Sequence, residues 1–211
     1  MTHSEITSPA LGAVEVHGMS RASFILRGAM TAGAVYGATA VGPYVGNALA
    51  ASGSGDLDTL NFALTLEYLE ADFYAHKAKS VGLSGEAKSL AALIAGHEQQ
   101  HVDALVKAIK GAGGTPVKKP TFAFPVSDQA SFLNLAYVLE NTGVGAYNGA
   151  GPSLKTPAYL AAAGSIVQVE ARHAAAIALL VGKAITPDGA FDEPQSKPQV
   201  LAKAGPLIKK A

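Results

Sequence analysis

The chain has 211 residues, of which 49% are hydrophobic and 15% charged, a balance typical of a packed globular protein rather than a disordered one. Sixteen basic and sixteen acidic residues cancel, and no basic stripe indicates a nucleic-acid partner. There is no cysteine, which excludes disulfides, thiolate zinc sites, iron–sulfur clusters and cysteine nucleophiles.

Residues 1–50 are predicted to form an export signal. Arg21 and Arg27 precede an uncharged stretch rich in Ala, Gly and Val, and small residues offer a cleavage site after Ala50. The segment "SRASFILRG" resembles a twin-arginine signal in which Ala22 stands in place of the second arginine. We therefore expect export to the periplasm or the cell exterior. An uncleaved membrane anchor and a cytoplasmic extension are the alternatives.

Residues 51–184 are predicted to contain four helices, bounded by capping residues, glycines and prolines. The first runs roughly from Asp56 to Lys79, the second from Ser84 to "GAGG" at 111–114, the third from Ser127 or Asp128 to "NGAGPS" at 148–153, and the fourth from Thr156 to about Lys183. No strand-like alternation competes with these helices, so we expect an all-α four-helix bundle.

The connections support this architecture. The segment "GTPVKKPTFAFPVSDQ" at 114–129 could extend over about 50 Å, which exceeds the roughly 38 Å length of a 25-residue helix. It could therefore cross over from one end of the bundle to the other between the second and third helices. The remaining tail, residues 185–211, contains four prolines and is predicted to be irregular, lying over the bundle or frayed.

Each predicted helix carries a glutamate within its apolar stripe. These are Glu67 in the first helix, Glu98 in the second, Glu140 in the third and Glu170 in the fourth. The second and fourth helices add a histidine three residues later, His101 in "EQQH" and His173 in "EARH". Residues three apart lie on one helix face, so each Glu-x-x-His pair faces the core.

The spacings indicate a duplicated helical hairpin. Glu67 precedes Glu98 by 31 residues, and Glu140 precedes Glu170 by 30. Alignment of the two copies on these glutamates superposes identical residues at Leu60/Leu133, Asn61/Asn134, Ala63/Ala136, Leu66/Leu139, Tyr74/Tyr147, Ile94/Ile166, His101/His173 and Ala104/Ala176. One Glu-x-x-His motif would be weak evidence, but two copies, each about 30 residues after a core glutamate, form a specific pattern.

The negative charge of four carboxylates in one core must be neutralised. An isolated ionised carboxylate costs many kcal/mol to desolvate, and neighbouring carboxylates repel one another. Two divalent cations would neutralise them, with the two histidines as nitrogen ligands. This donor set suits iron or manganese, and zinc also remains open.

The other polar residues near the stripes are expected to stay outside the site. Glu70 lies at the edge of the first stripe, and the equivalent residue in the second copy is Gly143, so Glu67 is assigned as the ligand. His76 points away from the stripe, and His97 is interpreted as a polar edge residue rather than a ligand.

These residues resemble the ferritin-like superfamily of di-iron carboxylate proteins over roughly residues 56–184, and the resemblance implies that the expected all-α bundle is a ferritin-like four-helix bundle. The stretch "LNFALTLEYLEADFY" is similar to the branch of secreted ferritin-like, desiccation-related proteins. The resemblance implies bridging roles for Glu98 and Glu170, and terminal ligand roles for Glu67, Glu140, His101 and His173. It also implies that Tyr74 and Tyr147 line the site, although both could be ordinary core aromatics.

Three functions follow as hypotheses. The first is a di-metal oxidase that binds Fe(II) and uses O2 or peroxide, in protection against oxidative or desiccation stress. The second is a non-enzymatic exported bundle with structural metal or none, and the third is a di-manganese catalase-like enzyme.

Without cysteine, a rubrerythrin-like peroxidase would need an external electron donor. An irregular tail does not resemble the fifth helix that closes ferritin cages, so a 24-subunit cage is not expected, whereas a homodimer is compatible. A membrane is a partner only if the N-terminal segment is retained.

Overall fold

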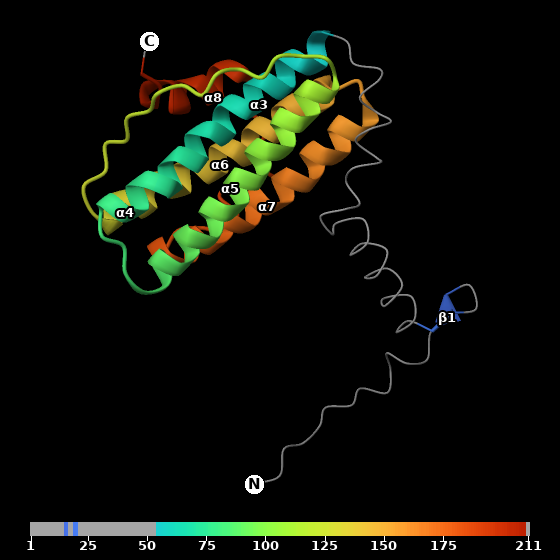
Figure 1. The fold of residues 1–211 in the computed structure, drawn as a ribbon. Helices are drawn as coiled ribbons and strands as arrows, with labels where there is room; N and C mark the ends of the chain where they lie inside the picture. Colours follow the sequence, from blue (N-terminus) through green and yellow to red (C-terminus); the bar gives the residue numbers. More distant parts are fainter. Residues whose placement is uncertain (1–14, 17–18, 21–53, 210–211) are drawn as a thin grey trace. The chain divides into compact units, whose positions relative to one another are not determined.

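The computed structural model describes residues 15–16, 19–20 and 54–209 (Figure 1). The chain divides into two compact units, residues 1–45 and 46–211. The first unit contains β1 (Glu15–Val16) and β2 (Met19–Ser20), which pair antiparallel. Apart from these four residues, the predicted export signal lies outside the described residues.

The second unit is a bundle of four long helices. Its elements are α3 (Ser54–Asp72), the π-helical η3 (Phe73–Lys77), α4 (Ala78–Ser80), α5 (Gly85–Gly111), α6 (Gln129–Ala150), the short η4 (Gly151–Ser153), α7 (Pro157–Val181), α8 (Lys197–Ala204) and η5 (Gly205–Leu207). The predicted all-α bundle is confirmed. The first predicted helix is the continuous rod formed by α3, η3 and α4.

Local sequence signals explain where the helices begin and end. Asp128 caps α6: its carboxylate accepts a hydrogen bond from the Ser131 backbone N–H at 2.7 Å, and the Ser131 hydroxyl reaches back to the Asp128 N–H. Pro157 is the first residue of α7, where its missing N–H costs nothing. Gly182 ends α7 in a left-handed conformation, with φ of 66°, that favours glycine.

The segment between α5 and α6 crosses the length of the bundle along α3. Near its start, the Val117 N–H donates to the Asn61 side chain at 2.7 Å, and further along Lys119 forms an ion pair with Asp72. At its far end, Gln129 accepts a hydrogen bond from the Ser84 N–H, which joins the first residue of α6 to the start of α5. The crossover predicted from loop length is therefore present, and α5 and α6 run parallel.

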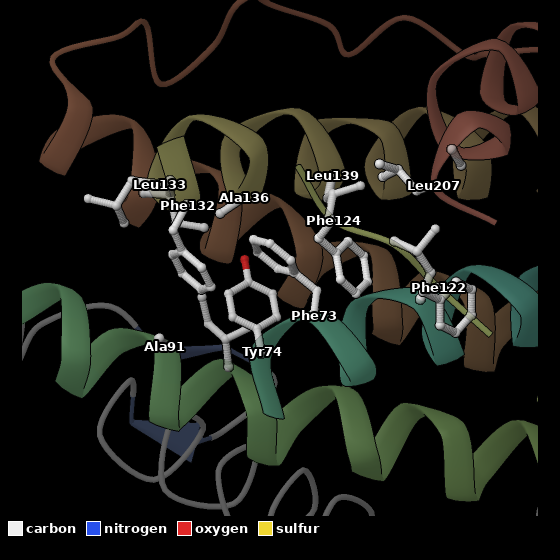
Figure 2. Close-up of a cluster of buried hydrophobic side chains, with 14 of the residues drawn as sticks. Phe73, Tyr74, Ala91, Phe122, Phe124, Phe132, Leu133, Ala136, Leu139 and Leu207 are labelled. Atoms are coloured by element: carbon white, nitrogen blue, oxygen red, sulfur yellow. The ribbon is translucent and has the colours of Figure 1, made fainter. Parts of the chain in front are cut away.

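The core consists of two apolar clusters at different levels of the bundle. One cluster contains an aromatic group in which Phe73 stacks on Phe132 with ring centroids 4.4 Å apart, and Phe124 of the crossover meets Phe73 edge-on (Figure 2). The other cluster gathers side chains such as Leu64, Ile109 and Tyr159. The polar residues at the middle of the long helices lie between these two apolar layers, so water is largely excluded from them.

The fourth long helix, α7, is the one described helix that is long and apolar enough to cross a membrane by length and composition. In the bundle, apolar side chains of α7 pack in the core. Ile166, Ala174 and Ile177 are buried, and a glutamate and a histidine lie on the same buried face.

The prediction of an irregular tail is wrong over residues 197–204, which form α8. Ser196 and Gln199 make a capping box at its start, and Val200 and Ala204 are buried. Just before α8, the Gln195 N–H donates a hydrogen bond to the Gly145 carbonyl of α6 at 2.8 Å. The Gln195 backbone lies so close to α6 that a Cβ added to Gly149 would be only 2.0 Å from the Gln195 carbonyl oxygen. Glycine at 149 therefore lets the tail lie directly on α6.

Candidate metal centre

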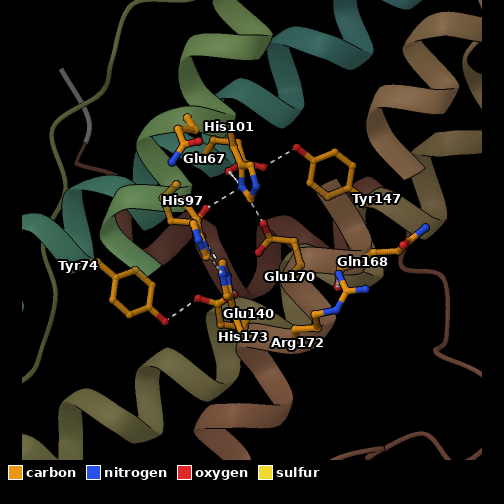
Figure 3. A network of polar contacts seen from close by, with 12 residues as sticks. Glu67, Tyr74, His97, His101, Glu140, Tyr147, Gln168, Glu170, Arg172 and His173 are labelled. Carbon is orange, nitrogen blue, oxygen red and sulfur yellow. Dashed lines mark hydrogen bonds and ion pairs between the residues drawn. The ribbon is translucent and has the colours of Figure 1, made fainter. Parts of the chain in front are cut away.

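Each of the four long helices directs one glutamate into the space between the apolar layers. Glu67 comes from α3, Glu98 from α5, Glu140 from α6 and Glu170 from α7, and each is fully buried. His101 on α5 and His173 on α7 join them, also buried. The structure thus brings together all six side chains that the sequence motifs singled out, and Figure 3 labels all of them except Glu98.

The six side chains form two overlapping groups of donors. One group is Glu67, Glu98, His101 and Glu170; the other is Glu98, Glu140, Glu170 and His173. Within each group, one ligand atom per residue lies within 4.8 Å of all the others, a spacing that could hold a metal ion. Glu98 and Glu170 belong to both groups, so each could contact two cations at once.

Each histidine presents its Nδ1 atom to several carboxylates. His101 Nδ1 lies 3.0 Å from Glu170 Oε1, 3.2 Å from Glu98 Oε2 and 3.3 Å from Glu67 Oε2. His173 Nδ1 lies 3.1 Å from Glu98 Oε1 and 3.2 Å from Glu140 Oε2. One nitrogen carries at most one proton, so it cannot donate a good hydrogen bond to two or three acceptors.

The carboxylates are left short of donors. Four buried oxygens accept no hydrogen bond of good geometry: Glu67 Oε2, Glu98 Oε1 and both oxygens of Glu170. Leaving such groups unpaired costs several kcal/mol each, and more for charged groups. A cation at each convergence of donors would satisfy these oxygens, so the residues present fit a two-metal site.

The pKa values reflect the same shortage. Burial raises the pKa of Glu67 to about 7 and that of Glu170 well above its ordinary value. Burial also opposes ionisation of Glu98, but contacts with His101 and His173 outweigh it and lower the pKa of Glu98 to about 2. Burial lowers the pKa of His101, yet its contacts with the three glutamates dominate and raise that pKa to about 12. Without metal, protons therefore supply part of the positive charge that the core requires.

Two tyrosines hold the outer oxygens of the carboxylates in a crossed arrangement. The Tyr74 hydroxyl, from the π-helical segment of the first rod, donates to Glu140 Oε1 on α6 at 2.5 Å. The Tyr147 hydroxyl, from α6, donates to Glu67 Oε1 on α3. Burial and the adjacent glutamates raise the pKa of both phenols well above the usual value, so both remain protonated donors. Such hydrogen bonds orient the carboxylates toward the centre.

His97 belongs to neither donor group, as expected for a residue that is not a ligand, but it contacts one of the candidate ligands. His97 Nδ1 lies 2.9 Å from His173 Nε2, and the two rings stack with centroids 5.1 Å apart. If His173 binds a cation through Nδ1, its Nε2 carries the proton and donates to His97. His97 therefore positions a candidate ligand. The sequence pattern missed it because it lies one residue from Glu98, off the stripe, and meets His173 only through the packing of α7 on α5.

Glu70 also departs from the sequence prediction. It is only 3% exposed, although its place at the edge of the stripe suggested a position outside the core. His76, in contrast, lies on the surface, where its side chain contacts Asp72.

A four-helix bundle with a carboxylate from each helix and two Glu-x-x-His motifs has a set of donors that could hold metal ions in its core. The chain belongs to the ferritin-like family: the model of the ferritin-like domain matches residues 55–183.

A solved structure of a conserved hypothetical protein from Mycobacterium tuberculosis has a similar fold, with a TM-score of 0.57 and 20% sequence identity. The match covers 68% of this chain and 96% of that one. At this identity the likeness concerns the fold alone. No curated protein sequence matches the chain.

The pKa values of the candidate ligands predict how the stabilisation of the protein by bound metal depends on pH. Burial raises the pKa of Glu67 to about 7; burial lowers the pKa of His173, but its contacts with Glu140 and Glu98 raise it to about 9. Between about pH 5 and 9, these groups therefore bind more protons in the folded, metal-free protein than in the unfolded chain. The free energy of unfolding of the metal-free protein falls as pH rises through that range. Cations require the deprotonated ligands, so their affinity rises over the same range.

We therefore expect the difference in Tm between Mn(II)-loaded and chelator-treated protein to widen from about pH 6 to pH 8, as measured by scanning calorimetry. A difference that stays constant or shrinks would contradict the assignment of these residues as ligands.

A second prediction concerns His97. The substitution His97→Ala removes the acceptor for the His173 Nε2 proton and should weaken Mn(II) binding by about 10- to 100-fold, as is usual when a residue supporting a ligand is lost. Isothermal titration calorimetry would measure this change. His76→Ala, at an exposed histidine, is the matched control and should leave affinity unchanged. Equal affinities for the two variants would exclude the positioning role.

Proposed function

We propose that this protein oxidises Fe(II) at the buried Glu/His centre, with O2 or peroxide as the oxidant. The observation that carries the proposal is the pair of overlapping donor groups that share Glu98 and Glu170. Two Fe(II) ions held side by side can deliver two electrons to one oxidant, which a single isolated site cannot do.

The donor types support iron as the substrate. The site offers carboxylate oxygens and imidazole nitrogens without any thiolate, a set that suits iron and manganese. Bound iron would supply the redox chemistry, because each Fe(II) loses one electron when it becomes Fe(III). With hydrogen peroxide as oxidant, two Fe(II) provide two electrons, two protons come from solvent, the O–O bond breaks and two water molecules form. With O2, the same two electrons and two protons yield hydrogen peroxide.

The surrounding residues prepare the site for this reaction. Tyr74 and Tyr147 orient Glu140 and Glu67, so the terminal carboxylates need not reorganise when the substrate ions arrive. The apolar layers on both sides exclude bulk water and strengthen the electrostatic attraction between the carboxylates and the cations. A protective role in oxidative or desiccation stress is consistent with the removal of Fe(II) and peroxide together.

This function predicts the behaviour of the Glu98→Gln variant. Because Glu98 serves both donor groups, its loss should reduce binding from two Fe(II) per chain to one or none. It should also slow the rise of ferric absorption in the near ultraviolet by at least about 100-fold, in line with the loss of a group that binds the reacting ions. Stopped-flow absorption after addition of O2 or peroxide to anaerobically loaded protein would measure the rate.

The control is Glu86→Gln, which removes an exposed carboxylate from the same helix and should behave as wild type. Two Fe(II) per chain in the Glu98→Gln variant would contradict the site. Metal binding by the wild type without Fe(II) oxidation would instead favour a non-enzymatic bundle, and O2 release from peroxide by the manganese form would favour a catalase-like enzyme.

We also propose that the protein acts after export, with residues 1–50 removed. The match to the ferritin-like domain begins at residue 55, just beyond the proposed cleavage point, and this supports the division of the chain. N-terminal sequencing of protein from the periplasmic or extracellular fraction should yield a chain beginning at Ala51. Recovery of only the full-length chain from the cytoplasm would contradict export.

A further inference from the structure

A cavity of about 310 Å³ lies between α6 and α7, outside the candidate metal centre. Most of its lining is apolar and includes Tyr147 of α6 and Leu160, Ala163 and Val167 of α7. None of the six candidate metal ligands lines it. An apolar cavity of about 150 Å³ is already large enough to bind benzene, so a cavity of this size has room for a small substituted ring.

Gly164 of α7 leaves part of this space open. Glycine within a helix is less favourable than alanine, because its backbone loses more conformational entropy on folding. Packing does not require a glycine here: beyond the adjacent residues and the backbone of its own helix, a Cβ added to Gly164 would meet no heavy atom within 4 Å. The equivalent position of the first hairpin is Ala92. The helix and its neighbours therefore do not explain this glycine, whereas the open cavity does.

The aromatic wall of the cavity is Tyr147, which also contacts the candidate metal centre. This residue is buried, and its hydroxyl donates to Glu67 (Figure 3). Because the hydroxyl is engaged by Glu67, Tyr147 offers the cavity its ring. Aromatic rings pack on one another in offset-stacked or edge-on arrangements that add to the energy of apolar burial. This wall therefore favours an aromatic occupant over an aliphatic one of equal size.

Asn148 supplies the polar side chain of the lining. It is half-buried, and its carboxamide has no hydrogen-bond partner among the described residues. A carboxamide both donates and accepts, so it suits a hydroxyl group. No described residue of the lining is charged, and a charged ligand would lose its hydration there without a compensating partner.

We propose that this cavity binds a small, uncharged, single-ring aromatic molecule with one hydroxyl group, of the phenol class. The ring packs against Tyr147 and fills the space beside Gly164, and the hydroxyl bonds to the Asn148 carboxamide. Because no candidate metal ligand lines the cavity, this site is separate from the proposed Fe(II) oxidation and requires no bound metal.

The test is a titration of the full chain with para-cresol, without added metal, followed by calorimetry and by NMR of the backbone amides. The wild type should bind with a Kd of about 1 mM or lower, with the largest shifts at Gly151 and Gly164. Gly164→Leu should weaken binding by about tenfold or more, because the leucine side chain occupies the cavity.

Gly96→Leu is the matched control. It makes the same substitution at a helical glycine of α5, where an added Cβ also meets nothing within 4 Å, and it should leave the Kd within about twofold. Both variants should melt no lower than wild type, because leucine has a higher helix propensity than glycine. The Tm therefore separates loss of the cavity from loss of folding.

The hydroxyl contact has a test of its own. Asn148→Ala should weaken para-cresol binding by about three- to tenfold, the range expected for one lost hydrogen bond. Toluene has a similar ring without the hydroxyl, so its affinity should be the same for Asn148→Ala and wild type. Equal effects on para-cresol and toluene would contradict the contact.

Several outcomes would overturn the inference. Absence of para-cresol binding to the wild type, or equal affinities of Gly164→Leu and Gly96→Leu, would refute the site. Equal or tighter binding of cyclohexanol would refute the aromatic class. A lower Tm of Gly164→Leu alone would show that the space beside this glycine does not admit a side chain, which also contradicts the proposal. Metal titrations of the same protein test the proposed function separately, since its failure leaves para-cresol binding unchanged.

Discussion

The burial of carboxylates between two apolar layers is the constraint on which the rest of this structure depends. Five glutamates lie at the middle of the bundle, and the nearby donors are too few for them: one Nδ1 atom of His101 faces three carboxylates, and both oxygens of Glu170 lack a hydrogen bond. Without cations this arrangement is costly, because protons and imidazoles neutralise only part of the negative charge of the buried carboxylates. Two divalent ions would neutralise the rest of that charge. The tyrosine hydrogen bonds and the flanking aromatic layer serve this same centre.

The duplicated hairpin supplies the centre with approximate twofold symmetry, and the departures from that symmetry carry functional information. Tyr74 and Tyr147 exchange partners across the bundle, as a duplication requires. Glu70 and His97 have no polar counterparts, since Gly143 and Val169 occupy the equivalent positions. Because His97 contacts His173 and Val169 cannot contact His101 in the same way, the two donor groups differ in the support of their histidines.

Much of the fold was accessible from the sequence because its signals are local. Caps, glycines and prolines placed the four long helices to within a few residues, and loop length implied the crossover. The sequence analysis did not predict the short helix α8, because the prolines of this segment suggested an irregular tail. However, Pro198 lies in the first turn of α8, where proline is tolerated. The spacing of Ser196 and Gln199 is also that of a capping box. The burial of Val200 against the bundle, a tertiary contact, completes that helix.

The sequence by itself determined the all-α architecture, the hairpin duplication and the set of six polar side chains in the apolar stripes, since helical periodicity fixes which residues share a face. The tertiary structure alone decided how those faces meet. It placed His97 against His173, because α7 packs beside α5, and it buried Glu70, because α6 presents a glycine opposite α3. Contacts between helices depend on their relative rotation and spacing, which no single helix encodes.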